Sequence, residues 1–163
     1  MDFRKGARAA FGVSSLGRSS QFAEQVPAFV PLHLHAEWDA ISYGRRNFLL
    51  AGQPSAVDTM LASMLPYLLE PVRLFAPDTD RALLLPHEGT LILREIAQLK
   101  GSQQSELVAW LDELDRSDSV QIVSTTSRQM VPLVESGEFR AELYYRLNVI
   151  RIDLAEAATD HIG

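Results

Sequence analysis

Beyond Asn47, short and largely apolar runs recur along the chain, separated by longer stretches in which apolar residues have helical spacing. Short apolar runs between turn residues are typical of strands that are buried on both faces of a sheet. We therefore predict strands at 48–51, 72–75, 91–93, 120–123 and 149–152.

The stretches between these runs predict helices. Apolar residues within 57–68 recur at the three- and four-residue spacing of an amphipathic helix. A second helix is predicted at about 102–115, with Ser102 or Ser105 as its cap, and a short one at 130–134. Strands that alternate with helices need crossover connections, so the sequence predicts an α/β three-layer domain with a mostly parallel sheet.

The two ends of the chain lack this regularity. Glycine and proline punctuate residues 1–44, which we expect to form a partly ordered extension with a short helix around 19–30. His33 and His35 would lie on the same face of an extended segment, but two histidines without a third ligand do not predict a metal site, and we expect none. Residues 155–163 are expected to form a flexible tail.

Composition narrows the class of protein. A chain of 163 residues with 47% hydrophobic residues and a mean hydropathy of −0.01 is typical of a globular domain with its own core. The chain has no cysteine, which excludes a zinc–thiolate site and a cysteine nucleophile and fits a cytoplasmic location. The net charge of −6 argues against a chain that coats nucleic acid, and no apolar run is long enough to cross a membrane.

The segment after the first predicted strand has the length and position of a phosphate-binding loop. Such loops follow the pattern G-x-x-x-x-G-K-[ST], in which backbone N–H groups and the lysine hold the phosphates. In 52–59 (GQPSAVDT), Gly52 and Thr59 match the first and last positions, whereas Val57 and Asp58 replace the second glycine and the lysine. This partial match alone is too weak to predict nucleotide binding.

Three runs in the second half of the chain are much more specific. They are 89–96 (GTLILREI), 122–128 (IVSTTSR) and 137–149 (GEFRAELYYRLNV), in that order. Together they resemble the AAA+ central domain of sigma-54-dependent transcription activators, the bacterial enhancer-binding proteins. The resemblance covers about 45–154 and implies a three-layer P-loop NTPase-like fold, here a degenerate core that lacks the C-terminal helical lid.

The resemblance also implies roles for single residues, because working members of this family bind and hydrolyse ATP with magnesium. Glu95 matches the second acid after the strand, which polarises water, and Thr126 matches the sensor threonine, which reads the γ-phosphate. Arg140 and Arg146 match the two arginines that reach into a neighbouring subunit's site. The degenerate nucleotide-binding positions are Gly52, Ser55, Asp58, Thr59, Arg94, Glu95 and Thr126.

The chain departs from the family at the charged positions of this site. Asp58 stands in place of the loop lysine, Arg94 in place of the magnesium-binding acid, and Ser127 in place of the sensor asparagine. The stretch 70–88 is shorter than in the family, and the G-A-F-T-G-A loop that contacts sigma factor is absent. We expect no direct DNA binding, because no helix-turn-helix follows the domain and the charge is acidic.

The exchange of lysine for acid and of acid for arginine amounts to a charge swap. Ser55 and Asp58 have the S-x-x-D spacing of a capping box, which would satisfy the helix N-terminus from within. A phosphate beside Asp58 would meet a like charge, at about 4 kcal/mol of repulsion per pair for an effective dielectric of 20. We therefore hypothesise an Asp58–Arg94 ion pair that closes the site. The alternative is that Arg94 points elsewhere and only ends the strand.

The other matched residues have structural interpretations too. Without nucleotide and magnesium, Glu95 has no water to activate, so we expect a vestigial strand-end carboxylate that pairs with a nearby cation. Arg140 and Arg146 are expected to pair on the surface with glutamates at helical spacing. These glutamates are Glu135, Glu138 and Glu142. No confident catalytic residue remains, and assembly into a ring of subunits is not expected.

Two classes of function follow, besides an inactive relic of the family. The first is a non-catalytic pseudo-ATPase in transcription regulation, a protein-interaction module without cofactor whose partner is an activator of the family or the transcription machinery. The second is a nucleotide-binding activator domain that holds ATP and Mg²⁺ through backbone donors and Arg94. The charge swap favours the first.

Overall fold

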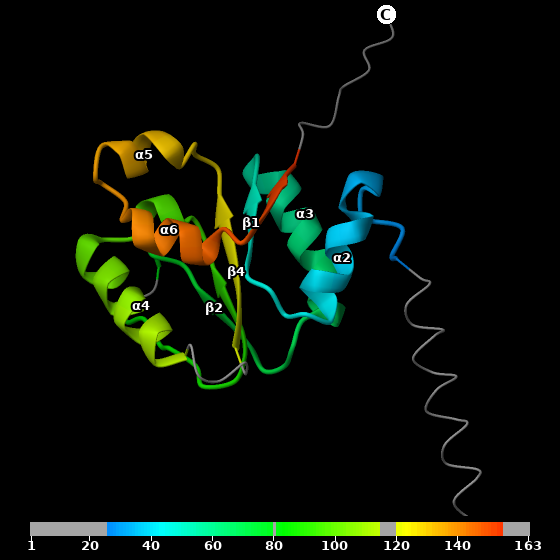
Figure 1. The fold of residues 1–163 in the computed structure, drawn as a ribbon, viewed down its shortest axis with the longest axis horizontal. Coiled ribbons are helices and arrows are strands. Elements are labelled where there is room, and N and C mark those ends of the chain that lie inside the picture. The colour runs from blue at the N-terminus through cyan, green and yellow to red at the C-terminus, as the bar shows by residue number, and fades with distance from the viewer. Residues whose placement is uncertain (1–25, 80, 115–119, 155–163) are drawn as a thin grey trace, which may run out of the picture. The chain divides into compact units, whose positions relative to one another are not determined.

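The computed structural model describes residues 26–79, 81–114 and 120–154. The chain divides into two compact units between Asp39 and Ala40, and the larger unit carries a five-stranded sheet. Its strands are β1 (Phe48–Ala51), β2 (Val72–Phe75), β3 (Gly89–Leu93), β4 (Val120–Thr126) and β5 (Ile150–Asp153). They are ordered β2-β3-β4-β1-β5, and every neighbouring pair is parallel (Figure 1). The predicted α/β fold with a parallel sheet is confirmed.

The place of each strand in the sheet explains its burial. β1 and β3 are buried at every residue, and β4 at every residue after Val120, because each has a neighbour on both sides. β2 and β5 are the two edge strands and are partly exposed. The charged side chains of Arg73 on β2 and Arg151 on β5 are tolerated because they reach solvent there. The predicted bounds hold for β1 and β2, whereas β4 continues from the predicted end at 123 to Thr126.

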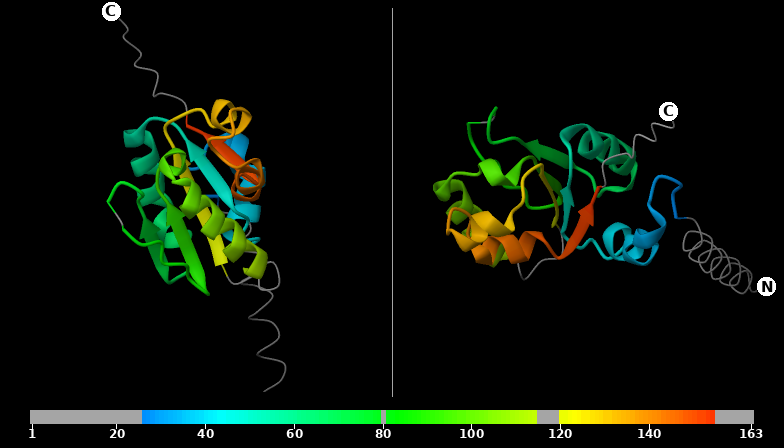
Figure 2. Two further views of the ribbon diagram at one scale, coloured as in Figure 1. Left: turned by 90° about the vertical axis from the view of Figure 1, so that its left-hand side faces the viewer. Right: turned by 90° about the horizontal axis from the view of Figure 1, so that it is seen from above.

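Helices cover both faces of the sheet. α3 (Pro54–Met64) lies on one face, and α4 (Gly101–Leu114) and α6 (Ala141–Leu147) lie on the other, which makes three layers (Figures 1 and 2). α5 (Val131–Glu135) precedes α6, and a short 3-10 turn, η2 (Leu65–Tyr67), extends α3. The periodicity did not predict α6, because a helix this short carries too few apolar positions to stand out from the sequence around it.

The amphipathic pattern places the buried sides of α3 and α4 correctly. In α3, Val57, Leu61 and Met64 are buried, at the spacing of one helix face. The predicted caps of α4 are wrong, because the helix already begins at Gly101 and includes both serines. The side-chain oxygen of Gln103 instead accepts a hydrogen bond from the Lys100 N–H at 2.9 Å, as one half of a capping box does.

One hydrophobic core joins the sheet to α4 and α6. Leu107 of α4 and Leu143 and Leu147 of α6 are fully buried in it, together with Leu93 of β3 and Ile122 of β4. Truncation of such a leucine to alanine costs roughly 2–5 kcal/mol, because the cavity that it leaves does not close completely. The strand ends that follow this core are therefore held on a rigid frame.

The smaller unit, described from Val26 to Asp39, consists of turns and the first part of a helix that continues into the larger unit. A 3-10 turn, η1 (Leu32–Leu34), leads directly into α2 (His35–Ser42), which the sequence analysis did not predict. The rings of Phe29 and Trp38 meet edge to face, with their centroids 5.6 Å apart. Such an aromatic pair stabilises by about 1 kcal/mol beyond the area that it buries.

The expectations for the chain ends are in part wrong. His33 and His35 lie in helical turns instead of an extended segment, and the His35 Nε2 atom is 3.1 Å from the Val30 carbonyl oxygen. Of the predicted helix at 19–30, only 26–30 are described, and these are not helical; the predicted tail at 155–163 lies outside the described residues. Within the described ranges, no three acidic or histidine side chains are grouped as metal ligands, and no helix is long and apolar enough to span a membrane.

Candidate functional site

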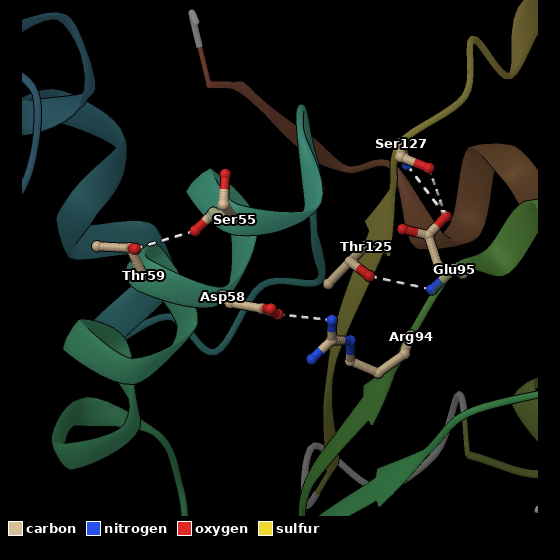
Figure 3. Close-up of polar contacts among 7 residues, drawn as sticks. All are labelled: Ser55, Asp58, Thr59, Arg94, Glu95, Thr125 and Ser127. Atoms are coloured by element: carbon tan, nitrogen blue, oxygen red, sulfur yellow. Dashed lines mark hydrogen bonds and ion pairs between the residues drawn. The ribbon is translucent and has the colours of Figure 1, made fainter. Parts of the chain in front are cut away.

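The carboxyl ends of β1, β3 and β4 meet at one edge of the sheet, because these strands are neighbours and parallel. α3 begins at this edge, and Arg94 and Glu95 follow β3 there. Figure 3 shows Asp58 of α3 facing Arg94, and Glu95 turned toward Ser127 just after β4. The structure thus brings together the charged residues on which the sequence analysis depended.

The connection from β1 to α3 is too short to form a phosphate-binding loop. α3 begins at Pro54, so only Gly52 and Gln53 separate it from β1. The Val57 N–H donates to the Gln53 carbonyl oxygen at 3.0 Å as a helical hydrogen bond. An anion-binding nest needs successive backbone N–H groups turned toward the ligand. Here Pro54 has no N–H, and that of Val57 is used inside the helix.

The predicted capping box at the start of α3 is wrong. The N-cap residue is Gln53, and Ser55 lies inside the first turn. The Thr59 hydroxyl donates to the Ser55 carbonyl oxygen at 2.9 Å, so the hydroxyl that the phosphate-loop pattern assigns to a metal ion is used within the helix. Pro54 explains the early start, because its fixed φ suits the first position of a helix.

Gly52 serves the packing of the chain. Its N–H donates to the Thr126 carbonyl oxygen at 3.0 Å, which continues the pairing of β1 with β4. A Cβ atom added to Gly52 would lie 2.9 Å from the Leu154 carbonyl oxygen and 3.0 Å from the Leu154 Cβ. Glycine is therefore needed for the close approach of the segment that follows β5, whether or not a ligand binds.

The hypothesised ion pair is present. Arg94 Nη2 lies 2.5 Å from Asp58 Oδ1, which joins α3 to the end of β3 (Figure 3). The Arg94 side chain is 28% exposed and that of Asp58 is 54% exposed, so water reaches the carboxylate more freely than the guanidinium. The Arg94 N–H also donates to the Phe75 carbonyl oxygen at 2.8 Å, which fixes the backbone of the arginine. The two exchanged charges neutralise each other.

Glu95 is held by the end of β4. Its backbone has φ +47, and its N–H donates to the Thr125 hydroxyl oxygen at 3.0 Å. Its Oε2 atom accepts hydrogen bonds from the Ser127 N–H and hydroxyl at 3.1 and 3.0 Å. The expected cation partner is therefore wrong, because Ser127 binds the carboxylate. A non-glycine residue at positive φ costs about 1–3 kcal/mol, which these contacts offset.

The two threonines that end β4 point in opposite directions, as successive strand residues do. The Thr126 hydroxyl donates to the Arg128 carbonyl oxygen at 2.9 Å and accepts from the Arg128 N–H at 3.1 Å, so it closes the turn after β4. Thr125, which the sequence analysis missed, contacts Glu95 instead. The alternation of side chains along a strand could have predicted this contact, because Thr125 and Ser127 are two residues apart and therefore lie on the same side of β4.

Arg140 and Arg146 take their partners from α4. The Arg140 Nη2 atom donates to the Ser105 hydroxyl oxygen at 2.8 Å, and the Arg146 Nη1 atom lies 2.6 Å from Asp112 Oδ1. For Arg140 a contact with Ser105 of α4 thus stands in place of the expected glutamate, and for Arg146 the ion pair with Asp112 joins α6 to α4. These long-range partners carry no local sequence signal.

The strand-end cluster, formed by Asp58, Arg94, Glu95, Thr125 and Ser127, is bonded within itself. Its one cation is joined to one of its two carboxylates, and the other carboxylate accepts hydrogen bonds from a serine. Triphosphate recognition needs unpaired cations and backbone donors, and a magnesium site needs oxygen ligands free to coordinate the metal. In this arrangement Arg94 is paired with Asp58, and one oxygen atom of Glu95 accepts hydrogen bonds from Ser127.

Comparison with known proteins identifies relatives among transcription regulators. A family described as the Sigma-54 interaction domain matches residues 33–156. A Nif-specific regulatory protein of Rhizobium leguminosarum bv. trifolii is 39% identical over 79 residues, which are 43% of this chain and 22% of that protein. Nitrogen fixation protein AnfA of Azotobacter vinelandii is 38% identical over 87 residues, 46% of this chain and 16% of that protein. These matches thus span a small part of each relative.

Solved structures share the fold. NtrX from Brucella abortus, in complex with ATP, superposes with a TM-score of 0.59 at 18% identity, over 90% of this chain and 43% of that one. The P-loop NTPase domain of a sigma-54 activator from E. coli superposes with a TM-score of 0.53 at 22% identity, over 77% of this chain and 94% of that one. The predicted P-loop NTPase-like fold is therefore confirmed.

Proposed function

Because the chain belongs to the sigma-54 interaction domain family, we propose that it acts in transcription regulation as a non-hydrolysing pseudo-ATPase, a protein-interaction module. Its expected partner is another activator of the family or the transcription machinery, in the cytoplasm. The observation that carries the proposal is the 2.5 Å contact between Asp58 and Arg94. It joins the two residues that replace the lysine and the magnesium-binding acid of the family.

Electrostatics at this contact oppose the binding of a nucleotide. A phosphate placed near Asp58 would meet a negative charge, with about 4 kcal/mol of repulsion per charge pair at an effective dielectric of 20. Arg94 would repel a magnesium ion that approached the end of β3 in the same way. A ligand that bound to Arg94 would also have to break its ion pair with Asp58, so the pair favours an empty site.

The backbone supports the same conclusion. α3 begins at Pro54, so the residues that would wrap a phosphate are helical. Glu95, the remaining acid of the ATPase pattern, accepts hydrogen bonds from Ser127 and follows Arg94 in the chain. The strand-end cluster contains no lysine that could bind a phosphate. The exchanged charges and the Glu95 carboxylate thus bind partners within the chain, which supports a module whose function is to bind proteins.

A second candidate is a nucleotide-binding activator domain that uses ATP and Mg²⁺ with altered phosphate contacts. The observation that favours it is the 54% exposure of Asp58, since an exposed carboxylate releases its partner at little cost. Arg94 would then be free to bind a phosphate as a bidentate donor. The helical start of α3 argues against it, because arginine alone replaces neither the loop amides nor a metal ligand.

Isothermal titration with ATP and ADP, each with and without magnesium, separates the two candidates. We expect no saturable heat at millimolar nucleotide. Saturable binding at micromolar concentration that disappears in Arg94→Gln, but persists in the control Arg73→Gln on exposed β2, would establish the second candidate. Phosphate release that is abolished by Glu95→Gln would refute the proposal outright. Co-purification with a full-length activator or sigma factor distinguishes the interaction module from an inactive relic.

A further inference from the structure

β2 ends the sheet and has one side without a neighbouring strand. In the order β2-β3-β4-β1-β5, it pairs only with β3, and the described residues of the connection from β2 to β3, 76–79 and 81–88, form no helix. The unpaired backbone groups of an edge strand are a template for another strand, which natural proteins usually cover or blunt. The free side of β2 is therefore one of the two edges of this sheet, with that of β5, at which a further strand can add.

Hydrogen bonding shows which residues face this free side. The Thr90 N–H donates to the Pro71 carbonyl oxygen at 3.0 Å, and the Arg94 N–H donates to the Phe75 carbonyl oxygen at 2.8 Å. In a parallel pair, alternate residues direct their N–H and C=O groups to the same neighbour. The backbone groups of Val72 and Leu74 therefore point away from β3, and in the described ranges no hydrogen bond involves them.

A shallow groove of about 320 Å³ runs along this edge. It is lined by Arg73, Leu74, Phe75, Ala82 and Leu84. Leu74 is 58% exposed and Leu84 is 67% exposed, which are large values for aliphatic side chains that lie in one groove. Clustered exposed leucines beside unpaired backbone groups are the features by which extended peptides are recognised, with hydrogen bonds for affinity and side-chain pockets for specificity.

The charge of the groove indicates the chemistry of its partner. Arg73 is the charged residue in the lining, it is exposed, and no ion pair involves it within the described ranges. One pairing with a second copy of this chain is disfavoured. The antiparallel register that joins Val72 to Leu74 of the copy, and Leu74 to Val72, puts the two copies of Arg73 directly opposite each other, where like charges destabilise.

We propose that the free edge of β2 binds an extended segment of a partner protein by strand addition. The segment places an aliphatic side chain against Leu74 and Leu84 and a carboxylate beside Arg73. This inference rests on the proposed interaction role and specifies the partner that the module takes. The short connection between β2 and β3 fits this inference, because a helix in that connection could cover the free edge of β2.

The test uses the full chain and a short fluorescent peptide of alternating valine and glutamate, followed by anisotropy. Saturable binding is expected. A peptide with lysine in place of glutamate should bind about fivefold more weakly, because an attractive exposed pair becomes repulsive. A peptide that is N-methylated at alternate residues keeps its side chains but loses its donors, and it should not bind. Equal binding of all three peptides would overturn strand addition.

Protein variants complete the test. Arg73→Glu should reverse the preference toward the lysine peptide, and Leu74→Lys should weaken both peptides. Arg81→Glu, at an exposed arginine outside the groove lining, should leave the preference unchanged. Circular dichroism confirms that each variant is folded, which is expected because these side chains are exposed.

Three further results would overturn the inference. The first is the absence of peptide binding, and the second is a charge preference that Arg73→Glu leaves unchanged. The third is a dimer, seen by light scattering, that Leu74→Lys dissociates, because it would assign the edge to a second copy. Nucleotide titration reports on the carboxyl ends of β1 and β3, so a failure of the pseudo-ATPase proposal can be distinguished from a failure of strand addition at β2.

Discussion

Removal of the Asp58 carboxylate tests the physical basis of the ion pair most directly. The perturbation is a double-mutant cycle of Asp58→Ala, Arg94→Met and the double variant, in which methionine keeps the apolar stem of the arginine. The cycle isolates the interaction between the two side chains from the packing that each makes separately. Asp58→Ala combined with Asp112→Ala serves as a control, because Asp112 pairs with Arg146 instead.

The structure limits the magnitude of this coupling. Two unit charges about 4 Å apart attract by about 4 kcal/mol at an effective dielectric of 20. Asp58 is 54% exposed, so solvent screening and the partial desolvation of Arg94 reduce that gross attraction to about 1 kcal/mol. In a domain of this size, 1 kcal/mol corresponds to about 2–4 °C in Tm.

Urea unfolding of the four proteins at about 0.05 M and about 1 M salt measures the coupling and its screening. We expect about 1 kcal/mol at low salt, at least half of it lost at high salt, and additive effects in the control pair. A coupling energy below about 0.2 kcal/mol at low salt would show that the 2.5 Å contact contributes nothing to stability. A coupling that salt leaves unchanged would refute its electrostatic origin.

Three further changes have definite expected outcomes. The charge-restoring double variant Asp58→Lys with Arg94→Asp should still bind no ATP by calorimetry, because α3 still occupies the place of the loop; saturable binding would show that charge alone closed the site. Gly89→Ala should lower the free energy of unfolding in urea by about 3 kcal/mol, because Gly89 has φ +87 and an added Cβ would overlap a backbone oxygen. The control Gly101→Ala should change it by less than about 0.5 kcal/mol, because an added Cβ there meets no atom within 4 Å. Gln104→Leu should cost about 3 kcal/mol in the same assay, because the buried amide contacts three backbone groups that would lose their partner.

The strands and the long helices could be predicted because burial leaves a periodic trace in the sequence. β1 and β3 are apolar since both of their faces are covered, and α3 and α4 have one apolar side each. The short helices α2 and α6 were missed, because few residues of each contact the core. The early start of α3 was missed because Pro54 begins a helix without a side-chain cap.

The sequence alone determined the order of the elements, the family, and the exchange of charge at Asp58 and Arg94, because these are properties of residue type and spacing. Only the tertiary structure decided that the two side chains meet, that Glu95 binds Ser127 instead of a cation, and that β2 keeps a free edge. The physical reason is that side-chain direction and strand order depend on contacts between residues far apart in the chain. Local periodicity carries no record of them.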